Sequence, residues 1–492
     1  MTASSSSSAS AAPAPALPRT AAIVTLCLIS AFPPLTMEIY LPSLPQLQRY
    51  FGTSADMVLL TISVYTAAFC LMQLLIGPLS DVHGRRRILL GSLVCYVLSS
   101  AAAAAATSVY ALLPPRVVQG CASASCIILA QAILRDLLEL PHREAVMVKL
   151  GMCKSGSALL APVIGSVLQG TLGWRATFGF LVAIGLLALL GAHAWLPESL
   201  PAERRQPRLQ LRSCLGGNAD VLRRLDFLCW AVPEALGFAG LFVWISTSAY
   251  IVQDFYGVPV LWFGLIYCVT FVGSVGGAYA APRMRRAPGD SYTVGSVLTV
   301  GASAVLAVAS LTPLMRTPSI ASQAVLQACM VVHAFGRGVC MVQAQTQSLE
   351  PFPTRAATAA GLMGAMRTAA TTVVTATASH ALRDGTPVVA CRAIFGLSAL
   401  SLLVYLGLRR LAARRGKPPP RGEVSGTAAL RVAGGGGGGG GAELTDAQVA
   451  ELAAAHAEAA AEGASEGAAP EAKHSTAELG AAPSAAPGAP AR

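Results

Sequence analysis

Apolar segments of about 20 residues follow one another along most of the chain, and each is long enough to cross a lipid bilayer. Charged residues make up only 12% of the 492 residues, whereas soluble proteins carry about 25%. Both observations predict an all-α membrane protein, because a helix satisfies its own backbone hydrogen bonds inside lipid. Twelve transmembrane helices are predicted, at residues 21–43, 57–78, 87–107, 111–133, 147–169, 176–196, 227–251, 261–281, 293–312, 320–346, 357–381 and 387–408.

Lysine and arginine collect in alternate loops between these segments. Cytoplasmic loops of membrane proteins are enriched in both residues, and an even number of spans places the two chain ends on the same side. We therefore expect both termini in the cytoplasm. The loops of the opposite side contain four arginines, namely Arg49, Arg175, Arg316 and Arg383.

The longest polar stretch between spans separates six spans from six, a symmetry typical of two-bundle transporters with a site near the membrane midplane. The tail after the last span is basic at first and then rich in Gly, Ala and Glu, a composition that predicts disorder. The predicted domains are a disordered cytoplasmic N-terminus (1–19), a first six-helix bundle (20–196), a cytoplasmic central loop (197–225), a second six-helix bundle (226–409) and a disordered cytoplasmic tail (410–492).

A charged turn from Gly77 to Arg87 joins the second and third apolar segments. Asp81 is placed at the membrane surface, where it can pair with the arginines or accept hydrogen bonds from a helix end. The glycines allow close approach of helices and backbone. The turn resembles the loop 2–3 signature of the major facilitator superfamily, G-x-L-S-D-x-x-G-R-R-x. The resemblance implies a major facilitator fold, whose two halves are latched by Gly77, Asp81, Gly84, Arg85 and Arg86.

The first span contains the segment Met37 to Pro42, which follows the helix-breaking pair at 33–34. This segment resembles the T-D-M-Y-L-P sequence of the Bcr/CflA drug-resistance family, with Glu38 at the aspartate position and Met37 in place of the threonine. A carboxylate inside the membrane is costly, so Glu38 is a candidate for gaining and losing a proton during transport. Alternatively, Glu38 lies at the membrane surface and ends the span.

The fourth span begins with Arg116-Val117-Val118-Gln119-Gly120. Three-residue spacing places Arg116 and Gln119 on one helix face. The segment resembles the R-x-x-Q-G signature of proton-coupled facilitators, in which the arginine stabilises a carboxylate. Because the first and fourth spans cross in such a bundle, the resemblance implies that Arg116 pairs with Glu38. An arginine that reaches the membrane interface is the alternative.

The fifth span contains a segment from Gly156 to Ser166. It resembles the antiporter signature G-x-x-x-G-P-x-x-G-G, with Ala161 and Ser166 replacing two glycines beside Pro162 and Gly165. Small residues allow helices of opposite halves to pack closely, and the proline kinks the span. The resemblance favours export by exchange, and a plain helix-packing face is the alternative.

Further charged residues lie within other spans. Lys154 and Glu234 are near cytoplasmic ends, where a long side chain can reach water. Arg337 and Arg367 lie deeper, and they either contact Glu234, contact the substrate or stabilise the bundle. The candidate substrate cavity is lined by aromatic and polar residues, namely Tyr40, Tyr65, Gln119, Glu234, Phe238, Arg337 and Arg367.

Together these features predict a proton-coupled antiporter that exports drugs or other small toxic compounds across the bacterial inner membrane by alternating access. We expect it to use the proton gradient and a small-molecule substrate, with no cofactor, metal or nucleic acid, and to act as a monomer in the bilayer. A facilitator for a metabolite such as a sugar or amino acid is one alternative. A membrane-anchored sensor or scaffold with an acidic tail is another. The sequence contains no arrangement typical of an enzyme.

Overall fold

The structure is a computed structural model that describes residues 19–138, 142–201, 203, 205–207, 218–284, 291–352, 356–382 and 385–414. The chain divides into two compact units, residues 1–423 and 424–492, and all described residues belong to the first. Every regular element in the described ranges is a helix. The segments expected to be disordered are 1–19 and 410–492. Arg19 begins a helix and residues 410–414 continue the last one, so the expectation is wrong for these residues. The rest of both segments lies outside the described residues, as does part of the central loop.

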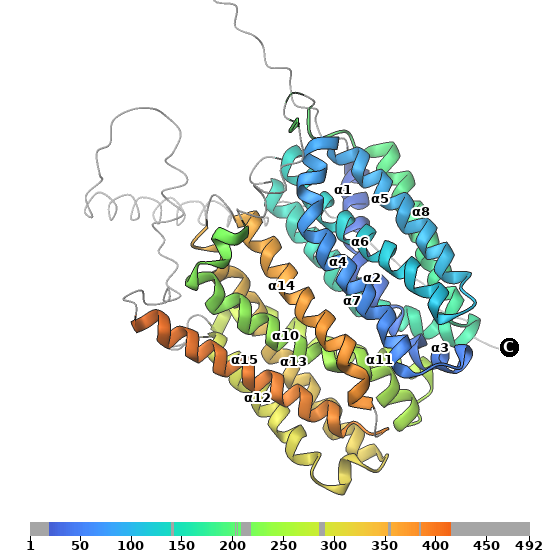
Figure 1. Cartoon of the computed structure of the whole chain (residues 1–492), viewed down its shortest axis with the longest axis vertical. Helices are drawn as coiled ribbons and strands as arrows, with labels where there is room; N and C mark the ends of the chain where they lie inside the picture. Colours follow the sequence, from blue (N-terminus) through green and yellow to red (C-terminus); the bar gives the residue numbers. More distant parts are fainter. Residues whose placement is uncertain are drawn as a thin grey trace, which may run out of the picture. The chain divides into compact units, whose positions relative to one another are not determined.

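The first bundle, blue to green in Figure 1, carries the six predicted spans of the N-terminal half. Sharp turns between its helices depend on glycine, since Gly84 and Gly173 have positive φ values of 89° and 83°. Ser54 and Ser108 cap the helices that follow them. The helices are α1 Arg19–Ser30, α2 Phe32–Glu38, η1 Leu41–Ser43, α3 Leu44–Phe51, α4 Ala55–His83, α5 Arg85–Ala104, α6 Val109–Leu137, α7 His142–Leu172 and α8 Trp174–Trp195.

The second bundle, green to orange in Figure 1, carries the other six predicted spans. Its first long helix, α10, continues directly into the π-helical turn η3. The helices are α10 Leu225–Tyr250, η3 Ile251–Phe255, α11 Val260–Met284, α12 Ser291–Ala309, η4 Pro313–Met315, α13 Ile320–Leu349, α14 Ala356–Thr377, η5 Ala378–Leu382 and α15 Val388–Arg414.

A helix is present at each of the twelve predicted spans, but they are not equally apolar. Ten helices of the described ranges are long and apolar enough to cross a membrane, and a bent pair within 20–51 can be counted as an eleventh. The remaining predicted span corresponds to α14, which does not reach the same apolarity. Six threonines and Arg367 lie in α14, and the helix packs between the bundles rather than wholly against lipid.

The first span is broken, as the two prolines predict. Pro33 and Pro34 lie in the first turn of α2, where a missing N–H is tolerated, and the chain bends by 40° between α1 and the helices that follow. Glu38 is therefore the last residue of a short helix in the middle of a broken span. Only 8% of its surface is exposed, so the alternative that Glu38 ends the span at the membrane surface is wrong.

The bundles meet along two pairs of helices, α4 with α14 and α7 with α11. An added Cβ on Gly264 of α11 would lie 2.6 Å from the Pro162 carbonyl oxygen of α7, so this contact requires glycine. Between α14 and α4, the Thr372 hydroxyl lies 3.0 Å from the Thr66 hydroxyl. Close backbone approach and hydroxyl contacts are typical of helix pairs inside membranes.

Candidate functional site

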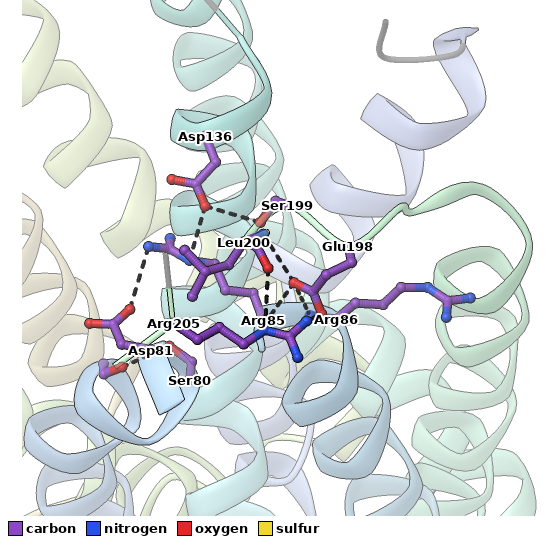
Figure 2. Close-up of polar contacts among 10 residues, drawn as sticks. Ser80, Asp81, Arg85, Arg86, Asp136, Glu198, Ser199, Leu200 and Arg205 are labelled. Atoms are coloured by element: carbon purple, nitrogen blue, oxygen red, sulfur yellow. Dashed lines mark hydrogen bonds and ion pairs between the residues drawn. The ribbon is translucent and has the colours of Figure 1, made fainter. Parts of the chain in front are cut away.

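The charged turn forms a network of ion pairs at the end of α4 (Figure 2). Arg85 pairs with Asp81 at 3.6 Å and, more closely, with Asp136 of α6 at 2.9 Å. The predicted pairing of Asp81 with an arginine is thus confirmed, and Asp136 is a second partner that sequence reasoning missed. Asp136 lies just after the predicted fourth span, next to Arg135 and in the last turn of α6, and this position was the available signal.

Glu198, in the segment after α8, caps the N-terminus of α5. Its Oε1 atom accepts hydrogen bonds from the backbone N–H groups of Arg85 and Arg86, at 3.0 and 3.4 Å, and from that of Leu200 at 3.1 Å (Figure 2). A carboxylate at a helix N-terminus satisfies free N–H groups and is favoured by the helix dipole. The network therefore ties α4, α5, α6 and the chain after α8 into one rigid end of the first bundle.

Arg86 and the two glycines of the turn differ in their roles. Arg86 donates to the carbonyls of His193 and Leu196 at the end of α8, at 2.8 and 2.6 Å. Gly84 is required by its φ of 89° and by the nearby Glu198. An added Cβ on Gly77 would meet nothing within 4 Å, so the expected close approach at Gly77 is absent in this conformation.

Replacing Gly84 with alanine is expected to destabilise the protein by about 1–3 kcal/mol, through a strained backbone and a displaced cap. The new Cβ would lie 2.6 Å from Glu198 Oε2 and 3.0 Å from Arg205. Thermal unfolding of the purified protein in detergent measures the loss. Gly77→Ala is the matched control, and equal melting of the two variants would contradict the prediction.

Glu38 contacts the second bundle. Its Oε2 atom accepts a hydrogen bond from the Tyr267 hydroxyl of α11 at 2.5 Å, and both side chains are buried. The expected ion pair between Glu38 and Arg116 is not formed, so this expectation is wrong for the conformation observed. Tyr267 was missed because nothing in the sequence indicates which helix of the other half faces Glu38.

Arg116 instead lies between two aromatic rings. Its guanidinium is 4.7 Å from the ring centre of Tyr40 and 4.5 Å from that of Tyr65. The guanidinium donates hydrogen bonds to the side-chain oxygen of Gln119 at 2.7 Å and to the Thr61 carbonyl at 3.4 Å. The first of these confirms that Arg116 and Gln119 lie on one helix face. All four neighbours are buried, as is Arg116, so the alternative of an interfacial arginine is wrong.

The geometry of the broken span explains why the acid and the arginine are separated. Residues two positions apart do not share a side of a helix, so Tyr40 and Glu38 point in different directions. The Tyr40 ring covers the Arg116 guanidinium, and the Tyr40 hydroxyl forms a hydrogen bond with the Thr61 hydroxyl at 2.9 Å. Glu38 is thereby directed to the other bundle.

A second pair of an acid and an arginine lies in the second bundle. Arg337 of α13 contacts Glu234 of α10 at 2.5 Å, and their side chains are 3% and 1% exposed. Gly237, one turn after Glu234, leaves room for the guanidinium, which an added Cβ would overlap. The expected contact between Arg337 and Glu234 is confirmed, whereas the expectation that Glu234 reaches the membrane surface is wrong because Arg337 holds it inside.

The residues of the predicted cavity thus form two groups rather than one. Tyr40, Tyr65 and Gln119 surround Arg116 in the first bundle. In the second bundle Glu234 and Arg337 pair, and the guanidinium of Arg367 lies 4.8 Å from the ring centre of Phe238. The sequence identified the residues but not this division.

The antiporter-like segment of α7 contacts both bundles. Pro162 lies against Gly264 of the second bundle, as predicted for small residues between the halves. Gly165 packs instead against the backbone of Ile39 in the first bundle, and Ala161 is fully buried. Gly156 has open space around it, so a helix contact there is not observed.

Polar contacts also join the bundles at the end of the molecule opposite to the Asp81 network. Arg49 of α3 pairs with Asp254 of η3 at 2.9 Å. Gln253 donates to the carbonyl of Pro42 at 3.0 Å. By contrast, the hydrogen bonds and ion pairs of Asp81, Arg85 and Glu198 in the described part of the chain stay within the first bundle and the segment that follows α8. The bundles are therefore joined at the α3 and η3 end in this conformation.

Replacing Tyr267 with phenylalanine is expected to loosen this closed end, because Glu38 loses its donor from the other bundle. A hydrogen bond to a charged group contributes about 1.5–3 kcal/mol, or roughly tenfold or more in population. Cys268, which donates to the Leu159 carbonyl across the interface, should then be alkylated about tenfold faster, as followed by peptide mass spectrometry. Tyr279→Phe, an exposed site on the same helix, is the control; unchanged Cys268 alkylation would contradict the prediction.

The fold and these paired bundles are those of a membrane transporter. The sequence profile described as Major Facilitator Superfamily matches residues 26–375. The chain therefore belongs to the major facilitator superfamily, as the charged turn predicted.

Relatives support the same assignment. A chloramphenicol resistance protein of Pseudomonas aeruginosa is 30% identical over 57% of this chain and 68% of its own length. A bicyclomycin resistance protein homolog of Haemophilus influenzae is 27% identical over 70% of this chain and 85% of its own. The MFS-type transporter YdgK of Bacillus subtilis is 26% identical over 77% of this chain and 96% of its own. The names of the first two fit the Bcr/CflA type of drug-resistance protein that the sequence resembles.

Solved structures share the fold at low identity. The nucleoside transporter NupG has a TM-score of 0.64 and 13% identity, over 79% of this chain and 99% of its own. A D-xylose–proton symporter has a TM-score of 0.62 and 16% identity, over 78% of this chain and 96% of its own. These likenesses show the major facilitator fold.

Proposed function

We propose that this protein is a proton-coupled antiporter that exports drugs or other small toxic compounds across the bacterial inner membrane. The names of its relatives support drug efflux, and the broken first span supplies a buried acid. We propose further that the chain acts as a monomer, has both termini in the cytoplasm, and needs the proton gradient but no cofactor.

The observation that carries the coupling is the hydrogen bond between Glu38 and Tyr267, which joins the bundles inside the membrane. This bond can form only while the bundles are together at this level. The affinity of Glu38 for a proton then differs between the closed and the parted arrangement. By linkage, a group whose proton affinity depends on conformation makes the conformation depend on protonation.

Arg116 supports this site from the first bundle. Its charge lies in a buried box of Tyr40, Tyr65, Gln119 and Thr61 without a carboxylate partner among the described residues. When the bundles part and Tyr267 moves away, the Arg116 guanidinium is the group of opposite charge available to Glu38 in the same bundle. The proposed role of Arg116 is thus to stabilise the ionised acid in the alternate conformation.

The Asp81 network serves as the latch at the opposite end. In the observed conformation it holds the helix ends of the first bundle in a fixed arrangement, through Arg85, Asp136 and Glu198. We propose that this rigid end contacts the second bundle when the α3 and η3 end opens. Alternation between the two ends would expose the substrate site to one side of the membrane at a time.

Transport by the purified full-length chain in proteoliposomes tests the proposal. Chloramphenicol should accumulate in vesicles whose lumen is more acidic than the outside, and a protonophore should abolish the accumulation. A metabolite facilitator would only equilibrate its solute and would ignore the pH difference. The proposal would be overturned if the pH difference changed neither the accumulation of chloramphenicol nor that of any other antibiotic in a panel.

A further inference from the structure

The short helix α2 carries Glu38 at its end, and its own backbone does not fix its direction. The helix has seven residues and includes two prolines, which lack an N–H group. Isolated helices shorter than about 12 residues are not stable on their own. Contacts with neighbouring helices therefore determine the direction in which Glu38 points.

One side of α2 lies against Tyr96 of α5. The Phe32 ring stacks on the Tyr96 ring, with the ring centres 4.6 Å apart. The Thr36 hydroxyl forms a hydrogen bond with the Tyr96 hydroxyl at 2.5 Å. Phe32 and Thr36 are four residues apart and share a helix face, and all three residues are fully buried. Tyr96 thus holds this face of α2 near its beginning and near its end.

Glu38 lies on the opposite side of α2. Each residue of an α-helix turns the chain by about 100°, so residues two positions apart are separated by about 200°. Thr36 and Glu38 therefore point away from each other. Thr36 is fixed to Tyr96 within the first bundle, while the Glu38 carboxylate accepts the hydrogen bond of Tyr267 from the second bundle at 2.5 Å.

Tyr96 is itself held by other helices of the first bundle. An added Cβ on Gly185 of α8 would lie 3.1 Å from the Tyr96 ring, so the glycine leaves room for this ring. The Tyr96 carbonyl accepts a hydrogen bond from the Ser100 hydroxyl at 2.7 Å, and this hydroxyl accepts one from the Gln119 amide at 2.8 Å. Gln119 in turn accepts from Arg116. Tyr96 thus connects α2 to the surroundings of Arg116.

We propose that Tyr96 is a positioning residue for proton coupling, which acts through Thr36 and directs Glu38 toward Tyr267. Without the Tyr96 hydroxyl, α2 is free to turn about its axis, and the acid and its donor no longer meet in one fixed arrangement. The inference rests on the proposed function, because Tyr96 would control how closely protonation of Glu38 is linked to contact between the bundles.

A double-mutant cycle on the purified full-length protein tests the inference. The readout is alkylation of Cys268, whose thiol donates across the bundle interface. Tyr96→Phe keeps the ring but removes the hydrogen bond to Thr36, so Cys268 should react about two- to tenfold faster, the range that one neutral hydrogen bond gives. In protein that already carries Tyr267→Phe, the same change should have no further effect, because Glu38 has lost its donor.

A merely structural role of Tyr96 would give a different pattern. General loosening of the first bundle would speed alkylation of Cys268 by the same factor with and without the Tyr267 hydroxyl. That result would overturn the inference, and so would a wild-type rate in Tyr96→Phe.

Variants of Thr36 remove or keep the same hydrogen bond from the side of α2. Thr36→Val has nearly the same shape and should reproduce the rate of Tyr96→Phe, whereas Thr36→Ser keeps the hydroxyl and should retain the wild-type rate. Tyr110→Phe, at an exposed site of α6, is the matched control. If Tyr96→Phe does not yield folded protein, the two Thr36 variants decide the question, and equal rates in both would contradict the proposed role.

The inference and the proposed function fail separately, since alkylation requires neither a substrate nor a pH difference. If the pH difference drives chloramphenicol accumulation but the effect of Tyr96→Phe does not depend on Tyr267, Tyr96 does not position Glu38 and antiport stands. If the effect depends on Tyr267 but the pH difference moves no antibiotic, proton-coupled drug export is wrong and Tyr96 remains the residue that directs Glu38.

Discussion

Replacing Glu38 with glutamine is expected to abolish accumulation of chloramphenicol driven by a pH difference, by at least about tenfold relative to the wild-type protein. Glutamine has almost the same size, and its oxygen can still accept the hydrogen bond that Tyr267 donates at 2.5 Å. It cannot take up or release a proton. The contact between the bundles is therefore retained while the link between protonation and conformation is lost.

Counterflow distinguishes this loss from a general failure. Exchange of labelled for unlabelled chloramphenicol at equal pH needs the bundles to alternate but needs no proton, so Glu38→Gln should still support it. Asp56→Asn, the same chemical change at an exposed site in the first turn of α4, should behave like the wild type in both assays. Undiminished dependence on the pH difference in Glu38→Gln would rule out this residue as the coupling group.

The helices could be predicted because lipid imposes a strong and local requirement. A span must be apolar over about 20 residues whatever surrounds it, so the positions of most spans follow from composition alone. The break at Pro33 and Pro34 is equally local, since proline lacks an N–H group. The exception is α14, whose polar threonines and Arg367 reflect packing against another bundle, which composition cannot express.

The partners of the charged residues could be predicted only in part. The common face of Arg116 and Gln119 follows from helix spacing. The contact of Arg337 with Glu234 was one of three alternatives that the sequence left open. The partner of Glu38 depends on the direction in which a broken span points and on which helix of the other half lies opposite. Neither is encoded in a local pattern, and the expected pair with Arg116 was wrong for this reason.

The pair formed by Glu234 and Arg337 is expected to have the largest effect on stability of any side-chain contact in the second bundle. Removing one member leaves the other charge buried, since the side chains are 1% and 3% exposed and 2.5 Å apart. Breaking a buried pair in this way costs about 3–5 kcal/mol. Glu234→Leu and Arg337→Met should therefore each lower the melting temperature in detergent by several degrees or prevent recovery of folded protein.

Replacing both members together separates the buried charge from the packing. The double variant leaves no unpaired charge, and Glu234 Oε1 and Arg337 Nε already lack partners among the described residues, so apolar replacements of similar volume should restore most of the lost stability. Arg224→Gln, which breaks the more exposed pair with Asp226 at 3.3 Å, should change stability by about 1 kcal/mol or less. A buried ion pair predicts low melting temperatures for the single variants and a higher one for the double variant. If the single variants have the melting temperature of the wild type while the double variant melts lower, the pair does not stabilise the protein in this way.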